Sequence, residues 1–87
     1  MEKILVVNAG SSSLKFSLYD IPTELEIVNG YIEKIGLDDS FWQIKVNGEK
    51  TGNSEQIKNH SDAVKVMIRE LLKNHFVESL DEIKGVG

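Results

Sequence analysis

The order of the first structural elements follows from residues 4–18, which read ILVVNAGSSSLKFSL. Residues 4–7 are apolar without alternation, which is typical of a central strand covered on both faces. Gly10 and three serines interrupt this run, and from Leu14 apolar and polar residues alternate, which predicts a second strand. A proline-containing turn at Asp20–Thr23 ends that strand. The stretch therefore predicts a strand, a tight loop and another strand.

Extended segments continue through the next part of the chain. Residues 24–35 are predicted to form one long strand with a glycine bulge at Asn29–Gly30, and a two-residue hairpin turn at the same place is the alternative. Residues 41–46 alternate again between apolar and polar side chains. Asn47–Gly48 then predicts a tight hairpin that returns the chain through residues 49–53.

The hydrophobic period changes in the last third of the chain. Apolar residues recur there at helical spacing, at Val64, Met67, Ile68, Leu71, Leu72 and Phe76. This spacing predicts a helix over residues 62–75, with Ser61 as its N-cap and Asp62 near the positive end of the helix dipole. Gly85–Gly87 is interpreted as the start of another strand. The predicted fold class is α/β, with antiparallel strands first, then a helix and the start of a further strand.

Composition argues against several classes of protein. The chain has 87 residues and no cysteine, which excludes a disulfide framework and a thiolate metal site. Its net charge is −4, and the ten Lys and Arg residues are interspersed with acids, unlike a nucleic-acid-binding face. The longest apolar run, Ile4–Val7, is too short to span a bilayer, and the N-terminus does not resemble a signal peptide. We therefore expect a cytoplasmic protein that binds neither nucleic acid nor membrane.

The Gly-Ser-Ser-Ser loop at residues 10–13 has the composition of an anion-binding turn. Glycine allows successive N–H groups to face one concavity, and the serine hydroxyls are further donors. Lys15 adds a positive charge, and the amide of Asn8 can offer oxygen to hydrated Mg²⁺ or a donor to phosphate. The residues alone leave a simple hairpin loop as an alternative. The loop is not a Walker A motif, because a strand rather than a helix follows it.

Other candidate residues favour structural explanations. His60 and His75 have no partners at metal-ligand spacing, so we expect solvated positions in a loop and at a helix end. Phe41 and Trp42 are candidates for stacking on a base. Trp42 shares a strand face with Ile44, which favours packing instead.

Three stretches of the chain resemble the N-terminal part of acetate kinases, the acetokinase family. They are residues 4–16 with 18–20, residues 30–36 and residues 83–87, which occur in the expected order. Members of that family are several times longer than this chain. Their two domains share the ribonuclease-H-like architecture of actin, Hsp70 and the sugar kinases, with ATP between the domains. The resemblance implies that residues 1–87 are the N-terminal part of the first domain.

The resemblance also implies an activity, the reversible transfer of the ATP γ-phosphoryl group to acetate to give acetyl phosphate and ADP. It implies that Asn8 helps to hold Mg²⁺ (or Mn²⁺) and that Lys15 binds ATP. The residues implied to line the phosphates are Gly10, Ser11, Ser12 and Ser13. Catalytic residues and the carboxylate pocket are implied to lie beyond Gly87, so we expect the fragment alone to be inactive. A homodimer is what the family implies for the full-length protein.

Three alternatives remain open at this point. The acceptor is propionate in closely related kinases. Butyrate kinases are a more distant possibility, because that branch usually varies the positions of Ala9 and Ser12. The third alternative is that the chain is a small β-rich binding module without catalytic activity.

Overall fold

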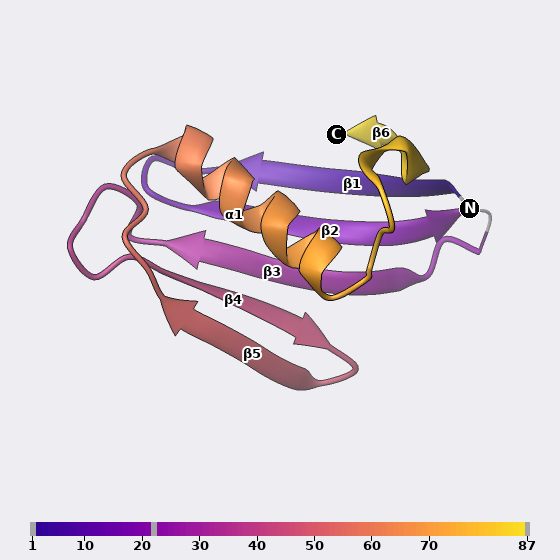
Figure 1. Ribbon diagram of the computed structural model, residues 1–87, viewed down its shortest axis with the longest axis horizontal. Coiled ribbons are helices and arrows are strands. Elements are labelled where there is room, and N and C mark those ends of the chain that lie inside the picture. Colours follow the sequence, from indigo (N-terminus) through magenta and orange to yellow (C-terminus); the bar gives the residue numbers. More distant parts are fainter. Residues whose placement is uncertain (1, 22, 87) are drawn as a thin grey trace.

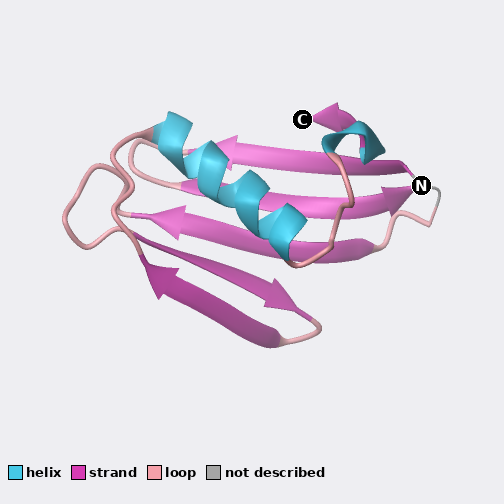
Figure 2. Cartoon of the chain, viewed as in Figure 1, coloured by secondary structure: helices cyan, strands magenta, loops and turns pink. Residues whose placement is uncertain are grey.

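The computed structural model describes residues 2–21 and 23–86. They form a six-stranded sheet in the order β5-β4-β3-β2-β1-β6, with helix α1 lying across one face (Figures 1 and 2). The elements in chain order are β1 (Glu2–Ala9), β2 (Leu14–Ile21), β3 (Glu26–Glu33), β4 (Phe41–Val46), β5 (Glu49–Ser54), α1 (His60–Lys73), the 3-10 helix η1 (Leu80–Glu82) and β6 (Ile83–Val86).

The sheet is mixed. Strands β1 to β5 form an antiparallel meander, and β6 pairs with β1 in parallel after the chain has crossed the sheet through α1. This arrangement confirms the predicted order of antiparallel strands, a helix and a further strand. The predicted turn at Asp20–Thr23 includes Pro22, and the predicted closing strand includes Gly87; both residues lie outside the described part of the chain.

Strand β3 is continuous, so the hairpin alternative at Asn29–Gly30 is wrong. The predicted bulge is also misplaced. The register between β2 and β3 shifts between Leu18 and Tyr19, which leaves Ile27 as the extra residue of β3. The irregularity therefore lies nearer the start of the strand, where β3 leaves the preceding turn.

Gly30 has a different role, because it permits close packing inside the sheet. A Cβ at this position would lie 2.5 Å from the carbonyl oxygen of Gln43 and 2.7 Å from Cζ of Phe16. Backbone atoms of β4 cannot retreat from such a contact without breaking the ladder. Glycine at residue 30 is thus required by its neighbours on β2 and β4.

The hairpin between β4 and β5 follows the sequence prediction closely. Asn47 and Gly48 have φ values of 52° and 85°, and positive φ at both central residues is the requirement of a type I′ turn. Strand β5 ends at Ser54, one residue beyond the predicted segment.

Helix α1 begins earlier than predicted, at His60, and ends at Lys73. Its N-cap is Asn59 rather than Ser61, because the side-chain oxygen of Asn59 accepts a hydrogen bond of 2.9 Å from the N–H of Asp62. Asparagine and serine cap helices about equally well, so composition did not distinguish the two positions. No helix in residues 2–21 and 23–86 is long and apolar enough to cross a membrane.

The buried face of α1 also differs from the predicted stripe. Val64 is 36% exposed, and the residues that face the sheet are Ala63, Val66, Met67, Glu70 and Leu71. These positions keep the spacing of one helix face, rotated by about one residue from the prediction. The fully buried Ala63 lets the first turns of the helix approach the sheet closely.

Strand β1 is central in the sheet, as predicted, since it pairs with both β2 and β6. The prediction that β1 is covered on both faces is wrong for the described residues, because only one of its faces is buried. Leu5 is buried on the α1 side, whereas Ile4 and Val6 are 38% and 41% exposed on the opposite face. The unbroken apolar run therefore produces one core face and one open apolar face.

An ion pair joins β1 to the segment that precedes β6. Lys3 is only 7% exposed, and its ammonium group donates a hydrogen bond to the carboxylate of Glu82. This bond, with the N–H groups of Glu78 and Ser79, lowers the pKa of Glu82 to about 2. This ion pair anchors the segment before β6 to strand β1.

Replacement of Gly30 by alanine should lower the free energy of unfolding by about 2–3 kcal/mol, because the new methyl group overpacks the contact with Gln43 and Phe16. Urea unfolding followed by circular dichroism measures the change. Gly85→Ala is the matched control, since its Cβ would lie 3.9 Å from the nearest atom, on Ile4. Equal losses in the two variants would contradict the packing explanation.

The Lys3–Glu82 pair should make stability depend on pH in the acidic range. Because the folded-state pKa of Glu82 is depressed, its contribution is present above the unfolded-state pKa and is lost as pH falls toward about 2. Thermal unfolding of the wild type and Glu82→Gln should therefore differ clearly at pH 7 and converge near pH 2. Glu49→Gln, an exposed change on β5, controls for net charge. A difference that stays constant between the two pH values would argue against the pair.

Candidate functional site

The loop at residues 10–13 joins β1 to β2 at the end of the sheet where α1 begins (Figure 1). Asn8 and Lys15 flank it and are directly opposite each other in the antiparallel register. Both are exposed, and both lie on the face away from α1, because their neighbours Leu14 and Phe16 are buried against the helix side. The structure therefore brings the amide and the ammonium group to one side of the loop.

Hydrogen bonds hold the backbone of the loop from within and from two distant segments. The N–H of Gly10 donates to the carbonyl of Ser13 at 2.9 Å, and the N–H of Ile35 donates to the carbonyl of Ser12 at 2.9 Å. Nε2 of His60 lies 2.8 Å from the carbonyl oxygen of Gly10 and 3.2 Å from that of Ser13. The carbonyls of Gly10, Ser12 and Ser13 thus each accept a hydrogen bond from a protein donor.

This arrangement suits an anion-binding turn. A carbonyl oxygen directed at an anion repels it, whereas N–H groups and hydroxyls attract it. Three of the four loop carbonyls, those of Gly10, Ser12 and Ser13, are engaged by protein, and Ser11 and Ser12 are exposed while Ser13 is half-buried. The loop is therefore polarised in the sense that most of its acceptors are bonded to protein while Ser11 and Ser12 are exposed.

Glycine at residue 10 leaves room for the hydroxyl of Ser13. A Cβ on Gly10 would lie 2.6 Å from Oγ of Ser13. Any side chain at residue 10 would therefore displace this hydroxyl by rotating the serine. Gly10 is not among the glycines with positive φ, so at this site the glycine contributes space, whereas the sequence suggests conformational freedom.

His60 is the residue of this site that the sequence did not reveal. It was expected in a solvated position, but it is half-buried and bonded to the loop. It is 50 residues from Gly10 in the sequence, and no local pattern connects the two. His75 does behave as predicted, with a side chain 77% exposed.

The segment before α1 is fixed by a buried serine, and this places His60. Oγ of Ser40 donates to the carbonyl of Glu55 at 2.6 Å and accepts from the N–H of Ile57 at 2.9 Å. The carbonyl of Ile57 in turn accepts from the N–H of Gly36 at 2.8 Å. Ser40 is 1% exposed, so these bonds are shielded from water and tie the start of α1 to the β3–β4 connection.

Trp42 packs in the core, as predicted, and does not offer a stacking surface. It is 7% exposed, its Nε1 donates to Glu55 at 3.2 Å, and the guanidinium of Arg69 lies 5.9 Å from its ring. Two hydrogen bonds from Arg69, at 2.7 and 2.8 Å, hold the pKa of Glu55 below its usual value against the opposing effect of burial. This cluster joins α1 to the end of β5 and is structural.

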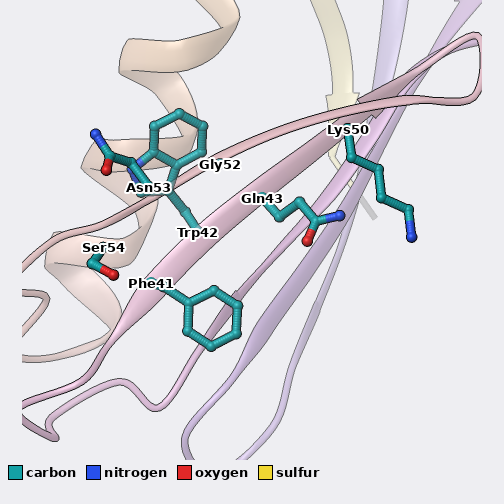
Figure 3. A pocket seen from close by; sticks show the side chains of 7 residues that line it. All are labelled: Phe41, Trp42, Gln43, Lys50, Gly52, Asn53 and Ser54. Atoms are coloured by element: carbon teal, nitrogen blue, oxygen red, sulfur yellow. The ribbon is translucent and has the colours of Figure 1, made fainter.

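A shallow depression of about 480 Å³ lies on the β4–β5 hairpin (Figure 3). Phe41, Gln43 and Lys50 extend from it on the side away from α1, whereas Trp42 lies on the helix side (Figure 3). Lys50 is the one ionisable side chain among the described residues that line it. Strand β3 separates this depression from the β1–β2 hairpin that carries the loop, so the two sites are distinct.

Comparison with known proteins decides the family. The model of the acetokinase family matches residues 3–87. The chain belongs to the acetokinase family. The resemblance inferred from the three sequence stretches is therefore confirmed.

Relatives within the acetokinase family are similar over the entire chain. Acetate kinase of Bacillus mycoides is 48% identical over 87 residues, which are 100% of this chain and 22% of that protein. The crystal structure of Porphyromonas gingivalis acetate kinase matches with a TM-score of 0.92 and 36% identity, over 100% of this chain and 23% of that one. A propionate kinase from Francisella tularensis matches with a TM-score of 0.85 and 29% identity, over 100% and 22%. This acetokinase-family chain thus spans about a fifth of the length of these relatives.

Proposed function

We propose that these residues are the N-terminal part of an acetate kinase, which transfers the γ-phosphoryl group of ATP reversibly to acetate and forms acetyl phosphate and ADP. The observation that carries this proposal is the 48% identity to a protein named acetate kinase over the whole chain. The polarised loop beside Lys15 supports it, because phosphoryl transfer depends on positioning and charge neutralisation.

In this proposal the loop binds phosphate oxygens of ATP. N–H groups and hydroxyls of Ser11, Ser12 and Ser13 act as donors, and Gly10 gives them room. Lys15 contributes a positive charge from the adjacent strand, on the same face as Asn8. Each of these groups stabilises negative charge without forming a covalent bond to the substrate.

The described residues fit a nucleotide-bound Mg²⁺ better than a free ion. No group of three or more His, Cys, Asp or Glu residues that suits a metal occurs in residues 2–21 and 23–86. Asn8 offers one neutral oxygen, and Lys15 opposite it would repel an isolated cation. Mg²⁺ commonly keeps several waters and takes few protein ligands beside substrate phosphates, so Asn8 would hold it directly or through water. When bound, the ion (or Mn²⁺ in its place) neutralises phosphate charge.

The remaining groups needed for acyl transfer belong, in our proposal, to the rest of a two-domain protein. Residues 1–87 would be the N-terminal part of its first domain. The described part of the loop region provides donors and one ammonium group, but the carboxylate pocket must come from elsewhere. We further propose a cytoplasmic homodimer that binds neither nucleic acid nor membrane, in keeping with the net charge of −4.

Propionate is the second candidate acceptor. The match to a propionate kinase, with a TM-score of 0.85, favours keeping it. Acetate is preferred because relatives that are 47–48% identical over the whole chain are named acetate kinases. A butyrate kinase and a non-catalytic binding module are the less favoured alternatives.

The full-length protein should form acyl phosphate from ATP, Mg²⁺ and acetate, whereas residues 1–87 alone should form none. Trapping of acyl phosphate with hydroxylamine measures both, and the kcat/KM values for acetate and propionate decide between the two acids. A full-length protein that forms no acyl phosphate from either acid would refute the proposal. Activity of the short chain alone would refute the assignment of the catalytic groups to the rest of the protein.

Replacement of Asn8 by alanine in the full-length protein should raise the Mg²⁺ concentration needed for half-maximal activity by about tenfold, the loss of one interaction of about 1.4 kcal/mol. Folding should be unaffected, because Asn8 is exposed near the end of β1. Asn53→Ala, an equally exposed change on β5, is the control. Identical Mg²⁺ titrations of Asn8→Ala and the wild type would remove Asn8 from the site.

A further inference from the structure

We infer that His60 is a positioning residue of the phosphate loop: its Nε2–H holds the Gly10 and Ser13 carbonyls, and so directs the N–H of Ser11 toward the phosphates of ATP. The inference rests on the proposed function. Its basis is geometric, since Nε2 lies 2.8 Å from the Gly10 oxygen and 3.2 Å from the Ser13 oxygen. Both distances are within the range of hydrogen bonds.

The chemistry of the two partners fixes the proton on the histidine. A backbone carbonyl only accepts hydrogen bonds, so Nε2 of His60 must be the donor and must carry the proton. One N–H is therefore shared between two carbonyls, as in a three-centre hydrogen bond. The imidazolium form keeps this donor as well, so the contact exists in either charge state of the ring.

Holding a carbonyl also directs the N–H of the following residue. In a planar trans peptide the C=O and the N–H point in opposite directions. When His60 holds the Gly10 carbonyl, the N–H of Ser11 must point away from His60. In the same way, the bond from Ile35 to the Ser12 carbonyl directs the N–H of Ser13. His60 thus sets the orientation of a loop donor without contacting the ligand itself.

The scaffold behind His60 is rigid enough for this role. His60 is the first residue of α1, directly after the N-cap Asn59, and the preceding segment is tied to the buried Ser40 through Ile57. A histidine on such a support defines the loop position better than a flexible side chain would. Loss of its ring leaves the Gly10–Ser11 peptide free to rotate, and the N–H then spends less time in the binding orientation.

The experiment compares four forms of the full-length protein: the wild type, His60→Ala, His60→Gln and His75→Ala. ATP binding is measured by calorimetry, kinetic constants are measured for ATP and acetate, and hydrogen exchange is measured on the peptide containing residues 8–16. His60→Ala should weaken ATP binding and raise KM for ATP by about tenfold, equivalent to about 1.4 kcal/mol. KM for acetate should change less than about twofold, and loop exchange should become faster.

Two variants separate positioning from general stability. His60→Gln places an amide donor near the position of Nε2 and should recover most of the ATP affinity. His75→Ala removes the other histidine, which is exposed beyond the end of α1, and should change none of the measurements. A purely structural role for His60 would instead raise both KM values or lower kcat without rescue by glutamine.

The remaining outcomes distinguish failure of the inference from failure of the proposed reaction. Unchanged ATP affinity in His60→Ala overturns the inference, even if loop exchange becomes faster. Weakened ATP binding in His60→Ala, with a wild type that forms no acyl phosphate, supports the inference and overturns the proposed reaction. A wild type that binds no ATP overturns both.

Discussion

Helix α1 packs on a single face of the sheet, and this contact decides which apolar side chains of the strands are buried. Leu5 is buried beneath the helix, whereas Ile4 and Val6 lie on the open face. The helix approaches closely at Ala63, and β2, β3 and β4 pack tightly together around Gly30. Burial of apolar surface is the main source of stability in a small domain, so this contact also fixes where the first turn of α1 lies on the sheet.

The same packing builds the site. Because the first turn of α1 lies over the end of β1, a histidine far along the chain meets the loop carbonyls of Gly10 and Ser13. Ile35 reaches the loop from the β3–β4 connection, and Lys15 lies beside it on β2. The loop is thus held by two distant segments, the start of α1 and the β3–β4 connection, which both depend on the sheet and the helix being in place. Its donors are arranged by backbone geometry more than by the side chains of the loop itself.

Local patterns predicted the elements whose causes are local. Alternation along β2 and β4 and the Asn47–Gly48 turn were read correctly, because period two and positive φ leave clear marks in a sequence. The N-cap was misplaced, since Asn59 and Ser61 satisfy the same chemistry and only the tertiary position of α1 selects between them. No local sequence pattern predicts the contact of His60 with the loop, because the two are 50 residues apart. The assignment of the loop residues to a phosphate site stays a prediction from composition and resemblance, and the partners that hold the loop backbone are distant in the sequence.

The parallel pairing of β1 with β6 has a consequence for the order of folding during synthesis. A chain emerges from the ribosome N-terminus first, so the antiparallel meander becomes available before its last strand. Lys3 meets Ile83 and Glu82 only when nearly the whole segment has been made, and until then β1 is an edge strand with open backbone groups. His60 likewise reaches the loop long after Gly10 has emerged. The loop at residues 10–13 is therefore among the first segments to be translated and among the last to be fixed, so its final shape depends on completion of this unit.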